Sequence, residues 1–138
     1  MELKFLDANP ILRFITRDRP DHAAAARLLF EQVARGQVSV TTSESIIVEV
    51  VQVLSSRVLY RLPRQEVQRD VNMVLSMKGL KLRGKRFYQR ALELYASSAV
   101  DFVDALCVAQ MEQQGIKVIL SFDRDFDRFP TVQREEPS

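Results

Sequence analysis

Four acidic residues of this chain lie inside or directly after its most apolar segments. Asp7 and Asp123 each end an apolar run of strand length, and Glu49 and Asp104 interrupt apolar stretches of helical length. Carboxylates are almost never buried unpaired, because removing an ion from water costs several kcal/mol. A salt bridge to one of the 20 basic residues would explain any single acid, but it explains all four together less readily. We therefore expect another counter-charge.

A hard divalent cation is the natural counter-charge for such a cluster. Oxygen ligands without His or Cys select Mg²⁺ or Mn²⁺, and one cysteine (Cys107) with one histidine (His22) cannot assemble the usual zinc sites. One or two such ions activate water for attack on a phosphodiester and stabilise the leaving oxygen. Because the ion lowers the pKa of its bound water, this nuclease chemistry requires no histidine base.

The elements that must position these acids alternate between strands and helices, which predicts a parallel sheet covered on both faces. Ligands bind such sheets beyond the carboxyl ends of the strands, where Asp7 and Asp123 are expected. If the helices carrying Glu49 and Asp104 flank the same crevice, the four carboxylates converge. The expected strands are residues 3–6, 38–41 and 118–122, and the expected helices are residues 20–36, 43–60, 63–75, 91–96 and 102–111.

Local signals mark several of these helix ends. Pro20 and Pro63 are expected in first turns, Gly36 is expected as a left-handed cap, and Thr41 with Glu44 resembles a capping box. Asn9 before Pro10 is consistent with a helix start, with the Asn9 side chain as N-cap.

The composition is that of one soluble domain. The 138 residues are 46% hydrophobic and 28% charged, with a net charge of +2 that is too small to identify a partner. We expect a single domain over residues 1–138, with residues 134–138 as a polar tail. No apolar run reaches membrane-span length and no export signal is recognisable, so we expect a cytoplasmic protein without membrane contact.

Four segments, in this order, resemble the PIN domain, and in particular the VapC-type ribonuclease toxins of toxin-antitoxin pairs. The third carries the pattern D-x-x-D-A-L and the fourth the turn F-D-R-D-F, and the resemblance extends over essentially the whole chain. The segments are residues 5–9 with Leu12, 42–50, 100–106 and 120–126.

The resemblance implies a doubly wound, three-layer α/β/α domain with a central parallel sheet of about five strands. It implies hydrolysis of RNA by acids that bind Mg²⁺ or Mn²⁺, with a cognate antitoxin protein and a homodimer as assemblies. Position by position, the catalytic and metal-binding acids correspond to Asp7, Glu49, Asp104 and Asp123, and the secondary site positions correspond to Asp101, Asp125, Asn9 and Ser121.

Structural roles remain open for the secondary positions. Asp101 is also well placed to cap the helix that follows it. Asp125 is equally consistent with a turn residue, and Ser121 with a side chain that caps a turn. Asp127 is expected to be a solvated surface charge.

A basic segment follows in residues 78–90, which contain six Lys or Arg and no acid. Its functional interpretation is an edge that contacts RNA phosphates beside an anionic site, and its alternative is a solvated face. The residues expected to bind RNA are Lys81, Arg83, Lys85 and Arg86.

The sequence therefore predicts a metal-dependent endoribonuclease that acts as the toxin of a toxin-antitoxin pair. The alternative is a non-catalytic PIN-like module that binds RNA or protein. A phosphatase with a nucleophilic Asp is disfavoured, because Asp7-Ala8-Asn9 lacks the expected D-x-D. The four glycines cannot form the G-x-G-x-x-G fingerprint of a dinucleotide-binding domain.

Overall fold

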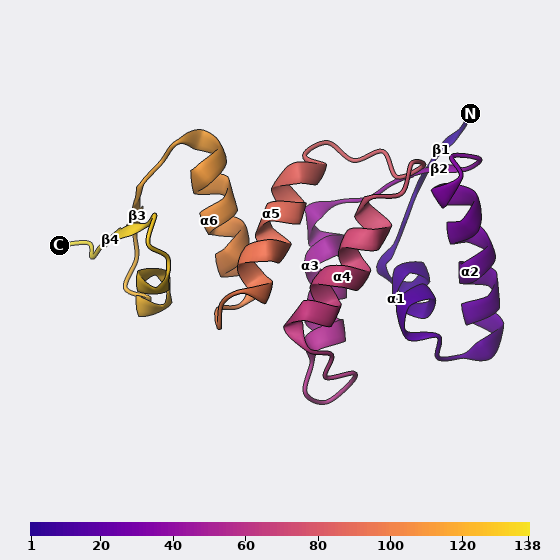
Figure 1. The fold of residues 1–138 in the computed structure, drawn as a ribbon, viewed down its shortest axis with the longest axis horizontal. Helices are drawn as coiled ribbons and strands as arrows, with labels where there is room; N and C mark the ends of the chain where they lie inside the picture. Colours follow the sequence, from indigo (N-terminus) through magenta and orange to yellow (C-terminus); the bar gives the residue numbers. More distant parts are fainter. The chain divides into compact units, whose positions relative to one another are not determined.

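The computed structural model of the protein describes residues 1–138, which divide into two compact units, residues 1–85 and 86–138. Figure 1 shows the elements of each unit. The single domain expected over the whole chain stays a prediction, because a compact unit is not necessarily a separate domain. None of the helices has the length and apolar character needed to cross a membrane.

The first unit is built on a short parallel strand pair and four helices. Strand β1 pairs with β2 with Leu3 opposite Ser39 and Phe5 opposite Thr41, and an isolated parallel bridge joins Val40 to Leu80. The elements are β1 (Leu3–Phe5), α1 (Ala8–Thr16), α2 (Pro20–Ala34), β2 (Ser39–Thr41), α3 (Glu44–Ser55) and α4 (Arg64–Leu75).

The core of this unit forms where one face of each helix is apolar. Helix α1 packs against α2 and α3, and α3 packs against α4. Buried residues recur three or four positions apart, as on one face of a helix, and they include Phe30, Val33, Val50, Leu54, Val67 and Leu75.

Gly79 allows three segments of the first unit to approach closely. Its N–H donates to the carbonyl of Val33 at 2.8 Å, and its own carbonyl accepts from Val40 N–H at 2.8 Å. A β-carbon at position 79 would overlap the carbonyl oxygens of Val33 and Val38. Only glycine therefore fits between the end of α2 and strand β2.

The second unit contains the helices α5 (Lys85–Ala96), which begins at the last residue of the first unit, and α6 (Phe102–Gln114). An ion pair between Arg90 and Glu112, 2.8 Å long, joins these helices, and the rings of Tyr95 and Phe102 meet edge to face. A second parallel pair follows, formed by β3 (Val118–Leu120) and β4 (Gln133–Glu135), with the 3₁₀ helix η1 (Arg124–Arg128) between them.

Helix α3 differs from its predicted boundaries at both ends. The N-cap is Ser43, whose Oγ accepts from Ile46 N–H at 3.4 Å, whereas Thr41 lies in β2 and caps nothing. The helix ends at Ser55, not near Tyr60. Ser55 Oγ donates to the Val51 carbonyl at 2.8 Å, and such local hydroxyl bonds compete with continued helix.

The remaining helices follow the predictions more closely. Helix α4 begins directly after Pro63, as expected, and Gly36 has the expected left-handed φ of 76°. Helix α5 begins six residues earlier than predicted, and α6 extends to Gln114 before its left-handed cap at Gly115. Asp7, not Asn9, is the N-cap of α1, so Asn9 lies inside the first turn.

The strands also depart from the expectation. About five were predicted, and the structure has four strands and the isolated bridge at Leu80. Strand β4 includes Arg134 and Glu135, which were expected in a polar tail. Strand β4 has a polar sequence without the apolar pattern that predicts a strand. It pairs with β3 through backbone groups, which every sequence provides.

Candidate metal site

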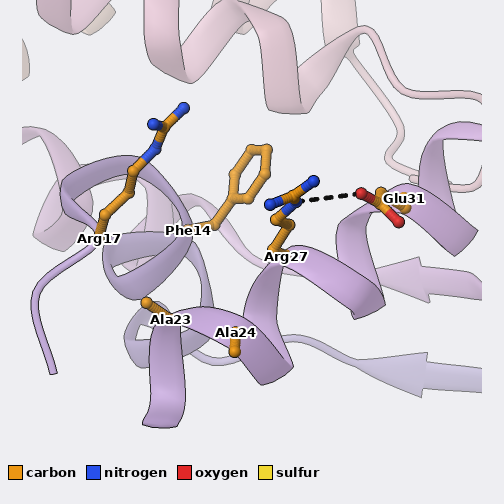
Figure 2. A pocket seen from close by; sticks show the side chains of 6 residues that line it. All are labelled: Phe14, Arg17, Ala23, Ala24, Arg27 and Glu31. Atoms are coloured by element: carbon orange, nitrogen blue, oxygen red, sulfur yellow. Dashed lines mark hydrogen bonds and ion pairs between the residues drawn. The ribbon is translucent and has the colours of Figure 1, made fainter. Parts of the chain in front are cut away.

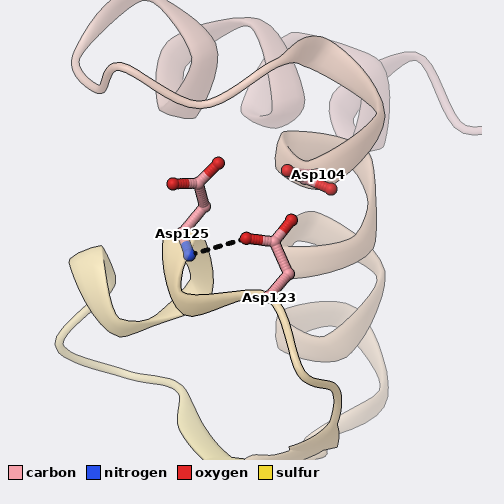
Figure 3. A group of neighbouring side chains, drawn as sticks. All are labelled: Asp104, Asp123 and Asp125. Atoms are coloured by element: carbon pink, nitrogen blue, oxygen red, sulfur yellow. Dashed lines mark hydrogen bonds between the residues drawn. The ribbon is translucent and has the colours of Figure 1, made fainter.

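Three carboxylates of the second unit form a cluster in which their oxygen atoms lie within 4.8 Å of one another. Asp104 projects from the first turn of α6, and Asp123 and Asp125 project from the start of η1 (Figure 3). Asp104 and Asp125 are half-buried, and Asp123 is exposed. The cluster therefore unites two segments that are far apart in the sequence.

Asp101 positions Asp104 by capping α6. Its Oδ1 accepts from the Asp104 N–H at 2.9 Å, so the structural role considered for Asp101 is confirmed. The buried side chains of Phe102, Ala105 and Leu106 fix the rotation of the helix. The Asp104 carboxylate is consequently held on the side that faces η1.

A chain of hydrogen bonds holds the other two acids. Ser121 Oγ accepts from Asp123 N–H, and Asp123 Oδ1 accepts from Asp125 N–H, each at 2.9 Å. The buried ring of Phe126 anchors the same turn. Ser121 thus has the turn-capping role considered from the sequence, and Asp125 is both a turn residue and a member of the cluster.

Arg134 supports this turn, although nothing in the sequence indicated it. Its side chain is only 12% exposed, and it donates to the Ser121 carbonyl at 3.1 Å and to Asp127 Oδ1 at 3.0 Å. Asp127 is exposed, as expected of a solvated surface charge, and it also forms an ion pair with Arg134. Strand β4 is therefore tied to the segment that carries Ser121 and Asp123.

The electrostatics of the cluster favour a bound cation. Burial, followed by the charges of Asp101, Asp123 and Asp125, raises the pKa of Asp104 to about 6. One cation lies near, since Arg128 Nε is 3.7 Å from Asp125 Oδ1. An all-carboxylate set with an excess of negative charge fits a hard divalent ion, which would relieve this repulsion.

Asp7 and Glu49 lie in the first unit, so their membership of the same site stays a prediction. Asp7 is the N-cap residue of α1, but its side chain accepts no capping hydrogen bond from the helix. The expectation that the four acids would be buried was wrong: Asp7, Glu49 and Asp123 are exposed. On α3 the apolar neighbours Ile47 and Val50 turn to the core, which leaves Glu49 on the outer face.

The predicted RNA-binding residues do not form a uniform set. Lys81, Arg83 and Arg86 are exposed. Lys85 is half-buried, and its ammonium group donates a hydrogen bond to the Met77 carbonyl at 3.1 Å. Burial, followed by the charge of Lys81, lowers the pKa of Lys85. Lys85 is therefore less available for a phosphate than its neighbours.

The chain is similar to a known protein family and to individual proteins. The PIN domain family matches residues 4–132. A VapC ribonuclease of Aquifex aeolicus (strain VF5) is 26% identical over 138 residues, which are 99% of this chain and 100% of that protein. The crystal structure of Mycobacterium tuberculosis VapC20, described as a sarcin-ricin loop cleaving toxin, covers 92% of this chain and 94% of its own, with 21% identity and a TM-score of 0.38.

Proposed function

Since the chain belongs to the PIN domain family, we propose that it is a metal-dependent endoribonuclease, the toxin of a toxin-antitoxin pair. The predicted resemblance to this family is confirmed, and with it the predicted three-layer α/β/α fold class. The full-length match to a VapC ribonuclease supports the activity. RNA is the proposed substrate class, and an antitoxin protein is the proposed partner.

The observation that carries the proposal is the cluster of Asp104, Asp123 and Asp125. Structural carboxylates are paired with cations or hydrogen-bond donors. In contrast, Asp104 lies among three other acids, and its pKa is raised by burial first and then by their charges. A divalent cation is the partner that fits such a site, and phosphodiester hydrolysis is its common use.

We assign roles to the residues as follows. Asp104 and Asp123 would hold the ion, with Asp125 beside them, and Asp101 and Ser121 position these acids through the backbone bonds described above. The family resemblance adds Asp7 and Glu49 to the proposed catalytic acids, and Asn9 to the secondary positions. The ion, proposed to be Mg²⁺ or Mn²⁺, supplies an activated water and stabilises the leaving oxygen.

The chain's own residues would do the positioning. The two carboxylates attached to η1 keep their places because hydrogen bonds fix that turn at Ser121 and Asp123. The buried face of α6 fixes Asp104 independently. Such preorganisation matters because misplacement of a ligand by about 1 Å costs about 100-fold in rate. A homodimer, as the resemblance implies, is part of the proposal.

An RNA cleavage assay with control of the metal tests this proposal. We expect no cleavage in chelator and restored cleavage with Mg²⁺ or Mn²⁺, but not with Zn²⁺ alone. Asp21→Asn serves as the matched control, since Asp21 is an exposed acid in the first turn of α2, and we expect it to cleave normally. Full activity in chelator would contradict the metal mechanism. RNA binding without cleavage under any metal condition would support the non-catalytic alternative.

A further inference from the structure

Three residues other than glycine have a positive φ angle, and all three are arginines. They are Arg17 at 59°, Arg19 at 53° and Arg61 at 52°. This conformation is uncommon for side chains with a β-carbon, and it stores conformational strain. At the end of a helix such as α1, glycine or asparagine would adopt it at lower cost. The fold alone does not explain why arginine occupies these three positions, which indicates a function for their guanidinium groups.

The two loops that contain these arginines are joined by one carboxylate. Asp18, between α1 and α2, accepts hydrogen bonds from Thr16 Oγ1 at 2.6 Å, from Arg13 at 2.8 Å and from the hydroxyl of Tyr60 at 2.5 Å. Tyr60 belongs to the loop between α3 and α4. The two loops consequently present their side chains as one surface of the first unit.

That surface is strongly cationic. Asp18, the acid in the middle of it, is already satisfied by its three donors, and the α3–α4 loop from residue 56 to residue 63 contains no acid. Four exposed arginines project from the two loops, and we call them the arginine surface: Arg17, Arg19, Arg57 and Arg61.

A cavity of about 540 Å³ lies between α1 and α2 beside this surface. Figure 2 shows the Phe14 ring between the guanidinium groups of Arg17 and Arg27. Ala23, Ala24 and Glu31 complete the lining, and Glu31 is paired with Arg27 at 3.2 Å, which leaves Arg17 as the lining cation without a lining acid beside it. The volume is within the range of small-molecule sites, ~300 to 1,000 Å³. An aromatic ring beside the guanidinium group of Arg17 is suited to a planar ligand that carries negative charge nearby.

We propose that the arginine surface binds single-stranded RNA, with phosphates on the arginines and one unstacked base in the cavity against Phe14. Arginine binds phosphate with two parallel hydrogen bonds, and unpaired bases stack on aromatic rings and on guanidinium planes. The proposal rests on the proposed ribonuclease function for the identity of the ligand. It assigns substrate binding to residues outside the acids and outside the basic segment 78–90.

RNA suits this surface better than a protein partner does. Val58 and Leu59 are exposed beside the arginines and would also suit an apolar partner. However, no acid remains unpaired in the linked loop segments to hydrogen-bond a protein's donors, whereas four guanidinium groups match a run of phosphates. A protein partner is therefore kept as an outcome of the test.

The experiment measures binding of a labelled single-stranded RNA by fluorescence anisotropy, in chelator so that the RNA survives, over a range of salt concentrations. Each lost phosphate contact lowers the slope of log affinity against log salt by about 0.7. Replacing Arg17 and Arg19 together with Gln should therefore lower it by about 1.4. The control replaces Arg35 and Arg69, two exposed arginines of the same unit, with Gln. It removes the same charge as the Arg17/Arg19 variant and should leave the slope unchanged.

Two further variants separate binding from folding. Arg17→Gly removes both the guanidinium and the strain, so it should raise the melting temperature while it weakens RNA binding. Phe14→Leu should lower affinity by about 5- to 150-fold, the range of one base–aromatic stack, and Phe14→Tyr should restore it. A structural role would instead make Arg17→Gly melt at a lower temperature, and that result would overturn the proposal.

The outcomes also distinguish this proposal from the function on which it rests. An unchanged salt slope in the Arg17/Arg19 variant, with RNA cleavage intact in the unmodified protein, would overturn only the proposed RNA binding by the arginine surface. A protein that neither binds nor cleaves RNA would overturn both.

Discussion

Asp18 and Asp104 are the same residue type in opposite surroundings. Asp18, in the first unit, accepts bonds from Thr16, Tyr60 and Arg13, which hold its pKa down at about 2. Asp104, in the second unit, is partly buried among Asp101, Asp123 and Asp125, and its pKa is raised to about 6.

The difference separates a carboxylate that stabilises the fold from one that awaits a ligand. The donors around Asp18 complete its hydrogen bonds, so it has no need of an external cation. Asp104 is placed where its charge is unfavourable unless a cation arrives. A fold retains such a position at the expense of stability, which is typical of functional sites.

The largest expected effect is on catalysis. Asp104→Asn should lower RNA cleavage by more than about 100-fold, because it removes a proposed metal ligand. Asp18→Asn should retain cleavage within a few-fold at saturating RNA. Single-turnover assays with both variants measure this contrast, and an equal loss in the two would remove the distinction between the carboxylates.

The next largest effect is on stability. Here Asp18→Asn, not Asp104→Asn, should be the damaging substitution. Asp18→Asn should destabilise the metal-free protein by about 1–2 kcal/mol, a value discounted for the exposure of Asp18, because it weakens three hydrogen bonds. Asp104→Asn should cause no loss, or a gain, since it relieves repulsion. Denaturant unfolding in the presence of chelator measures the free energy of unfolding of both variants. Marked destabilisation by Asp104→Asn would indicate a structural salt bridge instead.

The pH dependence of stability should differ in sign between the two residues. The lowered pKa of Asp18 contributes stability that is present above about pH 4 and lost as the pH falls towards 2. The raised pKa of Asp104 does the reverse: the metal-free protein should lose stability as the pH rises from about 4 to about 6. Thermal melts across this range should show each component disappear in the corresponding Asn variant, and a component that persists would refute its assignment.

The smallest expected effect concerns the basic segment. Replacing Lys81, Arg83 and Arg86 with Gln should lower the salt slope of RNA binding by up to about 2, if each contacts a phosphate. Lys85→Gln alone should lower it by less than about 0.7, the value for one phosphate contact, because its ammonium group is bonded to the Met77 carbonyl. Anisotropy titrations measure both slopes. If neither changes, the segment is only a solvated face.

Much of the fold was predictable from local patterns. Pro63 and Gly115 mark helix ends in the sequence as they do in the structure, since their backbone preferences act locally. Strand β4 was not predictable, because Arg134 owes its place to bonds with Asp127 and Ser121 that form only after folding. The end of α3 at Ser55 was not predictable, because the apolar pattern of the helix continues through Val58 and Leu59. In the structure these two residues are exposed in the loop that follows.

The site was predictable in its residue types but not in its surroundings. Asp104 and Asp123 were indicated by their apolar segments, where acids are unusual, and the family resemblance added Asp125 as a secondary position. Burial was wrongly expected for Glu49. A helix has 3.6 residues per turn, so an apolar run longer than one turn places some of its positions on the outer face. The Asp18 network joins residues more than 40 positions apart through Tyr60, and no sequence pattern indicates such a pairing.

The most direct test of the metal site is calorimetric titration of Mn²⁺ into three proteins: the unmodified chain, Asp104→Asn and Asp18→Asn. The account predicts that the unmodified chain and Asp18→Asn bind Mn²⁺ alike, and that Asp104→Asn binds it at least about 10-fold more weakly. Equal binding by the unmodified chain and Asp104→Asn would contradict a metal site at the carboxylate cluster.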